Sequence, residues 1–110
     1  MKLEELEVKS DRRGDLVEAF KLPSDGQIFY VNAAAGETRG NHYHLRKTEH
    51  FLVVNGEAKM QVRDRNTNRV MEIQVSGSSP MVVTVVPDHT HNIMSHTGCM
   101  FVVWCDDQFD

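Results

Sequence analysis

The chain has 110 residues, with 12 lysines and arginines against 16 aspartates and glutamates, and a formal net charge of −4. This length suits one domain with one continuous core, so we expect a single domain. The basic residues are scattered along the chain, which argues against a nucleic-acid partner. The start of the chain is acidic, and no stretch approaches the roughly 20 apolar residues of a membrane span, so we expect a soluble, cytoplasmic protein.

The first segment, residues 1–10, is charged, and we expect an arm or an edge strand there, ahead of one domain over residues 11–110. In that domain apolar residues recur mainly with a period of two, in short runs between turn-forming residues, which is typical of antiparallel strands. The predicted strands are, in chain order, Leu16–Phe20, Gln27–Ala33, Thr38–His44, Glu49–Val54, Glu57–Arg63, Val70–Val75, Met81–Val86, His91–Met94 and Cys99–Cys105. So many short strands in one small domain favour an all-β fold that closes into a barrel.

Two polar segments predict turns between neighbouring strands. Asn55-Gly56 offers the positive φ angles of a tight hairpin, and residues 64–68 form a polar loop. Apolar and polar residues alternate over 58–62 and again over 71–75. We therefore expect one face of these strands to be core and the other face to be wet.

The two cysteines, Cys99 and Cys105, stand at the ends of one apolar run that follows a predicted polar turn over residues 95–98. On a strand that rises about 3.3 Å per residue they would lie roughly 20 Å apart, whereas a disulfide tolerates a Cα separation of about 7 Å. We therefore expect two free thiols that pack as small core residues.

Two histidines and a glutamate form the most informative cluster in the chain. His42 and His44 are two residues apart, so on one strand both imidazoles face the same side, and Glu49 begins the next strand. Imidazole and carboxylate together suit divalent ions such as zinc, iron, manganese or nickel. His91, at the start of a late strand, is the best-placed fourth ligand. The sequence thus predicts one divalent metal ion held by three histidines and one glutamate.

The spacing of this cluster resembles the first motif of the cupin superfamily, in which Gly, five residues, His-x-His, three or four residues, Glu and six residues precede a second Gly. Its fixed positions are occupied by Gly36, His42, His44, Glu49 and Gly56. The second cupin motif is matched in part, by His91, with Asp88 where a glycine is common. The resemblance implies a small single-domain jelly-roll β-barrel, the cupin fold, with a metal ion in it.

Further segments are similar to a narrower family. They are Arg12–Glu18, Arg39–His44, Glu49–Val54, Thr90–Ile93 and Trp104 followed by Phe109–Asp110. They resemble the C-terminal cupin of CapF-type enzymes of capsular polysaccharide biosynthesis, which are related to sugar 3,4-ketoisomerases. In that family, the resemblance implies, a zinc-binding cupin epimerises a UDP-linked 4-keto amino sugar, which an attached domain then reduces with NADPH. This sequence has no Gly-rich strand-to-helix turn, so we expect no reductase activity in it and a separate reductase chain as a partner.

The implied function is that of a metal-dependent epimerase or isomerase of a nucleotide-linked keto sugar, in which the ion polarises a carbonyl. A non-enzymatic module that binds a small sugar or acid, and an iron dioxygenase, remain alternatives. Arg39 is a candidate for binding the nucleotide diphosphate. His89, Tyr43 and Lys59 are candidates for the proton-transfer residue, although the last two have the parity of outward-facing side chains. The charged N-terminal strand suggests a homodimer that pairs through edge strands.

Overall fold

The computed structural model describes residues 1, 5, 7–21 and 26–105, with the backbone alone for residues 19–21. The strands are β1 Lys9–Asp11, β2 Gly14–Lys21, β3 Gln27–Ala33, β4 Thr38–His42, β5 Glu49–Asp64, β6 Val70–Ser76, β7 Val82–Val85 and β8 His89–Cys105. Every strand pairing among them is antiparallel. The part of the chain described here contains no helix that could span a membrane. The all-β prediction is confirmed.

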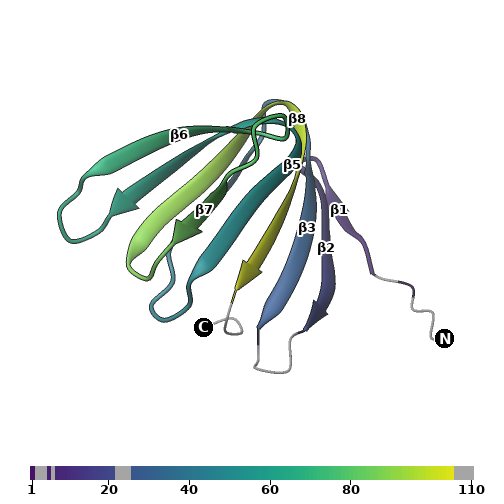
Figure 1. Ribbon diagram of the computed structural model, residues 1–110, viewed down its shortest axis with the longest axis horizontal. Coiled ribbons are helices and arrows are strands. Elements are labelled where there is room, and N and C mark those ends of the chain that lie inside the picture. Colours follow the sequence, from purple (N-terminus) through teal and green to yellow (C-terminus); the bar gives the residue numbers. More distant parts are fainter. Residues whose placement is uncertain (2–4, 6, 22–25, 106–110) are drawn as a thin grey trace.

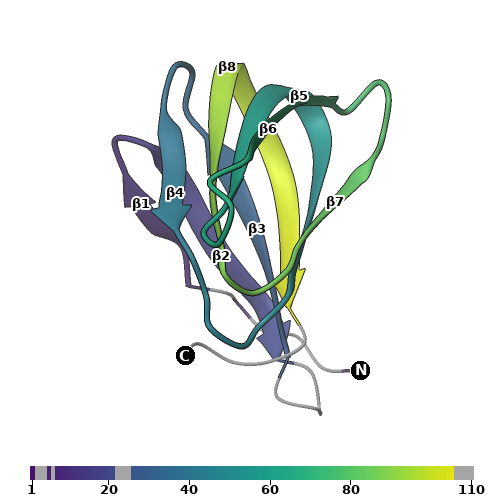
Figure 2. The same cartoon turned by 90° about the vertical axis from the view of Figure 1, so that its left-hand side faces the viewer.

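The strands form two layers that share the long strands β5 and β8. In the first layer the strand order is β1-β2-β3-β8-β5-β7. The part of β8 that belongs to this layer is residues 99–105, which pair with β3 and with the first half of β5. In the second layer β4 and β6 flank the other halves of β8 and β5. Both long strands curve over at the top of Figure 1, and Figure 2 shows the layers from the side. This arrangement is the predicted jelly roll.

The predicted hairpin at Asn55-Gly56 is wrong, because β5 continues through it and joins two predicted strands. Gly56 does have a positive φ of 83°. The register with β8 shifts on both sides of this pair, between Val53 and Asn55 and between Gly56 and Ala58. Because β8 runs beside both halves of β5, the positive φ produces a bulge that bends the strand, and the chain does not reverse its direction there.

The predicted turn over residues 95–98 is likewise wrong, because β8 passes through it without a break. Gly98, with a φ of 92°, lies opposite the bend of β5. A Cβ atom on Gly56 would collide with the backbone oxygen of Gly98 and would lie 2.9 Å from the Cα atom of Cys99. The two long strands therefore bend together at a point where their backbones touch, and glycine permits this approach.

The core lies between the layers and consists of alternate residues of the strands. Ala58 and Met60 are fully buried, as the alternation predicted. On β6, the edge strand of its layer, Val75 is buried but Met71 is 65% exposed, so the predicted core face of this strand is buried only in part. The rest of this core cluster is Phe29, Val31, Ala33, Phe51, Val53, Val83, Val85, Ile93, Cys99, Phe101 and Val103. Cys99 and Cys105 are buried free thiols, which confirms the prediction.

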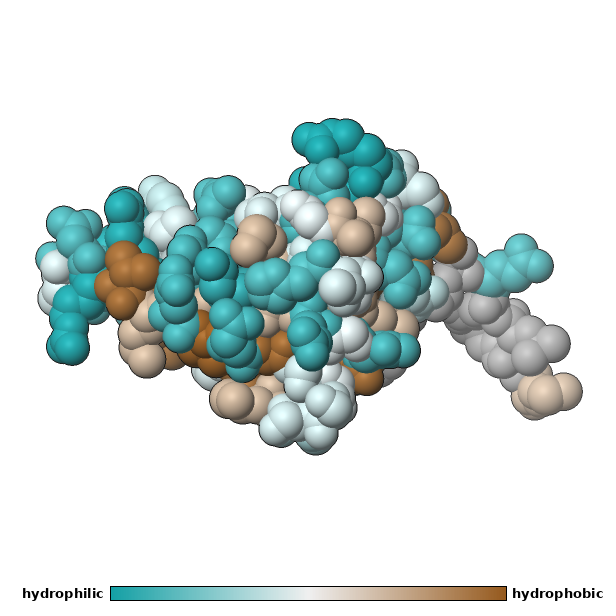
Figure 3. All heavy atoms as spheres, turned by 90° about the horizontal axis from the view of Figure 1, so that it is seen from above, coloured by the Kyte–Doolittle hydropathy of each residue, from teal (hydrophilic) through white to brown (hydrophobic). Residues whose placement is uncertain are grey.

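The remaining boundaries differ little from the predicted ones. The polar loop over residues 64–68 does join two antiparallel strands, β5 and β6. β4 ends at His42 instead of His44. β1 pairs with β2 at the edge of the sheet and spans the predicted boundary at residue 11. Seen from above, the surface is mainly hydrophilic with scattered hydrophobic patches (Figure 3).

Candidate metal centre

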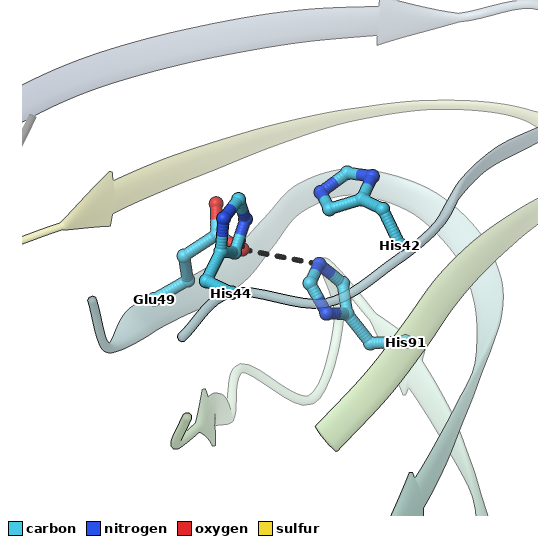
Figure 4. A group of neighbouring side chains, drawn as sticks. All are labelled: His42, His44, Glu49 and His91. Atoms are coloured by element: carbon cyan, nitrogen blue, oxygen red, sulfur yellow. Dashed lines mark ion pairs between the residues drawn. The ribbon is translucent and has the colours of Figure 1, made fainter. Parts of the chain in front are cut away.

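The four predicted ligands come from separate elements and meet at one place. His42 ends β4, and His44 follows it in the loop that leads to β5. Glu49 is the first residue of β5, and His91 on β8 pairs directly with His42. One ligand atom from each side chain lies within 4.8 Å of the others. Figure 4 shows the four side chains directed toward one another.

Glu49 is the centre of the contacts within this group. Its Oε1 atom lies 3.1 Å from Nε2 of His44 and 3.1 Å from Nε2 of His91. The ring centroid of His42 lies 4.9 Å from that of His44 and 4.7 Å from that of His91. His91 is only 3% exposed, so its imidazole is shielded from water. Glu49 and His91 are buried, whereas His42 is exposed and His44 is partly exposed. Nitrogen and oxygen donors that converge in this way fit a divalent cation, which would balance the carboxylate and satisfy their lone pairs.

At His42 and Glu49 the pKa shifts favour the protonation states that bind a metal. Burial lowers the pKa of His42, and the charges of His91 and His44 lower it further. Burial alone would raise the pKa of Glu49, but the hydrogen bond with His91 and nearby positive charges outweigh it, so this pKa is lowered. A neutral imidazole and an ionised carboxylate are the forms in which these side chains ligate ions.

The group opens onto a cavity of about 250 Å³. Much of its wall is apolar, formed by Leu16, Phe29, Val31, Phe51, Ile93, Phe101 and Val103. Three cationic residues, Arg13, Arg39 and Lys47, complete the wall beside the candidate ligands. The cavity therefore combines an apolar surface with positive charge, which suits a ligand that has both an apolar ring face and acidic oxygens.

Two of these cationic residues were not predicted from the sequence. Lys47 is 2% exposed, and its charge lowers the pKa of Glu49. Lys47 lies in the loop between β4 and β5, where strand parity does not apply. Arg13 lies in the turn between β1 and β2 and reaches the cavity only because the first layer packs there. No local pattern in the sequence marks it.

Arg39, predicted to contact a substrate, does line the cavity, whereas the three proton-transfer candidates are not among the described residues of its wall. Tyr43 is 43% exposed, and the guanidinium carbon of Arg65 lies 3.6 Å from its ring centroid. His89 Nδ1 lies 3.0 Å from the backbone oxygen of Pro87. Lys59 is on the half of β5 that belongs to the second layer. Their catalytic roles stay predictions.

Comparison with solved structures first establishes the relatives of the fold. The capsular polysaccharide assembling protein CapF from Staphylococcus aureus superposes with a TM-score of 0.91 and 34% identity over 98% of this chain and 30% of that chain. CapF with the inhibitor 3-isopropenyl-tropolone gives a TM-score of 0.90 and 35% identity, over 96% of this chain and 31% of that chain. Oxalate decarboxylase from Bacillus subtilis, with a TM-score of 0.82 and 16% identity over 94% of this chain and 28% of that chain, shares the cupin fold.

Sequence comparison gives the family. A curated relative, the UDP-2-acetamido-2,6-beta-L-arabino-hexul-4-ose reductase of Pseudomonas aeruginosa, is 38% identical over 103 residues, which are 92% of this chain and 28% of that protein. The chain thus spans less than a third of the length of this relative. Residues 9–110 match the family described as the polysaccharide biosynthesis C-terminal domain. The chain therefore belongs to the polysaccharide biosynthesis C-terminal domain family.

Proposed function

We propose that this domain binds one divalent metal ion and acts as an epimerase or isomerase on a nucleotide-linked keto sugar in polysaccharide biosynthesis. The observation that carries the proposal is the convergence of one ligand atom from each of His42, His44, Glu49 and His91, at a place where His42, Glu49 and His91 line the cavity. Zinc is the ion we propose, because three imidazoles and one carboxylate form a donor set that it accepts.

The proposed reaction moves a proton to and from the carbon beside a ketone, which builds negative charge on the ketone oxygen. A divalent ion bound in this group would supply Lewis-acid polarisation of that oxygen. Phe51 and Phe101 contribute apolar surface to the cavity wall, and apolar surroundings strengthen electrostatic interactions. Lys47 adds a positive charge beside Glu49. The residues of this chain thus provide an apolar and positively charged site for the ketone oxygen, on which negative charge builds up.

The size of the cavity limits what part of the substrate it holds. Its volume of about 250 Å³ is below the roughly 300–1,000 Å³ of pockets that enclose a drug-sized ligand. A single sugar ring suits such a space better than a whole nucleotide sugar does. We therefore propose that the keto sugar enters the cavity and that the nucleoside lies outside it.

The relatives support the substrate class. The name of the Pseudomonas aeruginosa relative describes a reductase of a UDP-linked hexul-4-ose, and the name of CapF describes the assembly of capsular polysaccharide. We extend the UDP-linked keto sugar to this domain, and we do not assign the reduction to the residues described here. The described residues contain strands alone as regular structure, whereas a dinucleotide-binding fold needs helices over a parallel sheet.

Proton exchange with solvent tests this function. A UDP-4-keto sugar incubated in deuterated buffer with metal-loaded protein is expected to acquire deuterium at the carbon next to the ketone, detected by NMR. Chelated protein and the His42→Ala variant are expected to lose this exchange. Binding of the sugar without exchange would support the binding module instead, and consumption of dioxygen would support the dioxygenase. The absence of exchange with fully metal-loaded protein would refute the epimerase.

A further inference from the structure

The three cationic residues of the cavity differ in what balances their charge. Arg13 is neutralised within its own turn, because its Nη2 atom lies 2.7 Å from Oδ2 of Asp11. The charge of Lys47 acts on Glu49. Arg39 has a buried Nη1 atom without a hydrogen-bond partner among the described residues. A buried donor without an acceptor raises the free energy of the folded state, and a ligand that supplies an acceptor would remove this cost.

A bulge places Arg39 on the same cavity as the candidate metal ligands. In a regular strand Arg39 and His42, three residues apart, would face opposite sides. The pairing of β4 with β8 shifts register between Gly40 and His42, and Asn41 has a positive φ of 61°. Both side chains therefore line the same cavity. Bulges often re-aim side chains next to functional sites.

The surroundings of Arg39 are short of negative charge. Burial lowers the pKa of its guanidinium, the charge of Arg13 lowers it further, and Asp11 only partly offsets them. An arginine nevertheless keeps its charge in proteins and presents a planar fork of donors that matches carboxylate and phosphate oxygens. The missing partner at this position is thus an anionic oxygen group.

We propose that Arg39 binds an anionic oxygen group of the ligand, and that in a nucleotide sugar this group belongs to the diphosphate. The identity of the anion rests on the proposed function, whereas the anion-binding role of Arg39 does not. The ligand is held at two points, by the candidate metal group at the ketone and by Arg39 at a phosphate. A sugar ring that is held at its ketone and at its phosphate has a fixed orientation, so the same carbon beside the ketone is always presented for proton exchange.

Calorimetric titration of metal-loaded protein with UDP and with uridine tests the proposal. UDP is expected to bind at least about tenfold more tightly than uridine, and Arg39→Gln is expected to remove most of this difference. Arg39→Lys keeps the positive charge but loses the planar set of donors of the guanidinium, so this variant should retain part of the difference in affinity between UDP and uridine. Arg12→Gln is the matched control, because Arg12 is 80% exposed and pairs with Glu37 at 2.9 Å outside the cavity wall. Metal content and the thermal midpoint of each variant verify that it is loaded and folded.

The outcomes separate this inference from the proposed function. Unchanged UDP binding in Arg39→Gln, or an equal loss in Arg12→Gln, would overturn the role of Arg39. Malonate, a small dicarboxylate, serves as a second probe of the same subsite. Binding of malonate that depends on Arg39, without binding of UDP, would retain the anion subsite and reject the nucleotide sugar. Arg39-dependent UDP binding without deuterium exchange would retain the subsite and reject the epimerase.

Discussion

Chelation of the metal ion is expected to lower the midpoint of thermal unfolding of the wild-type protein by roughly 10–20 °C. A ligand that binds only the native state at 100 times its Kd stabilises that state by about 2.7 kcal/mol. In a domain of this size each kcal/mol shifts the midpoint by roughly 4–8 °C. Without the ion, the Glu49 carboxylate stays buried between the imidazoles of His44 and His91, 3.1 Å from a nitrogen of each.

Two variants serve as controls for this experiment, which uses differential scanning calorimetry with and without chelator. His42→Ala should begin at a lower midpoint and change little on chelation, because the ligand set is already incomplete. Arg12→Gln should respond like the wild type, since Arg12 is exposed and lies outside the cavity wall. An identical midpoint for wild-type protein with and without chelator would contradict a metal bound in the native state.

Gly56→Ala is expected to reduce the free energy of unfolding by roughly 2–4 kcal/mol. The added Cβ would collide with the backbone oxygen of Gly98 and lie 2.9 Å from the Cα atom of Cys99. Both are backbone atoms, so the two long strands must separate at the bend that they share. Because β5 and β8 belong to both layers, this separation disturbs the core on either side.

Gly36→Ala is the matched control for Gly56→Ala. Gly36 also has a positive φ, of 77°, but a Cβ atom built on it meets nothing within 4 Å. This variant therefore measures the conformational strain alone, which we expect to cost about 1 kcal/mol. Urea denaturation of both variants gives the two free energies. Equal losses in the two variants would show that the close approach of the strands contributes nothing.

Local patterns in the sequence were enough to predict the all-β fold and the buried face of the central strands, although two predicted turns lie within strands and Met71 is exposed. Alternation over a few residues determines which side chains point inward, and Ala58 and Met60 are buried for that reason. The same rule predicted His42 and His44 on one side of a strand, but β4 ends at His42, and His44 reaches the group from the loop that follows. Glu49 follows in the motif, and His91 pairs with His42 through the ladder of β4 and β8. Each of these features depends on residues that are near in sequence or on the order of the strands.

The bends of the long strands could not be predicted in this way. Asn55-Gly56 satisfies the φ requirements of a hairpin and of a bulge alike, and the choice depends on β8, which comes later in the chain. The same is true of residues 95–98 on β8 itself. The cavity wall presents a similar problem, because Arg13 reaches it through the packing of the layers. Such contacts between distant segments leave no periodic trace in the sequence.

The metal content of the purified protein is the most direct test of the candidate metal centre. Inductively coupled plasma mass spectrometry would be applied to the wild type, His42→Ala and His91→Ala, prepared in parallel and reconstituted with zinc. We expect about one divalent ion per chain in the wild type and a large loss in both variants, because each removes one of the four donors. Wild-type protein that retains no ion after reconstitution, or variants that retain as much as the wild type, would contradict a centre formed by these residues.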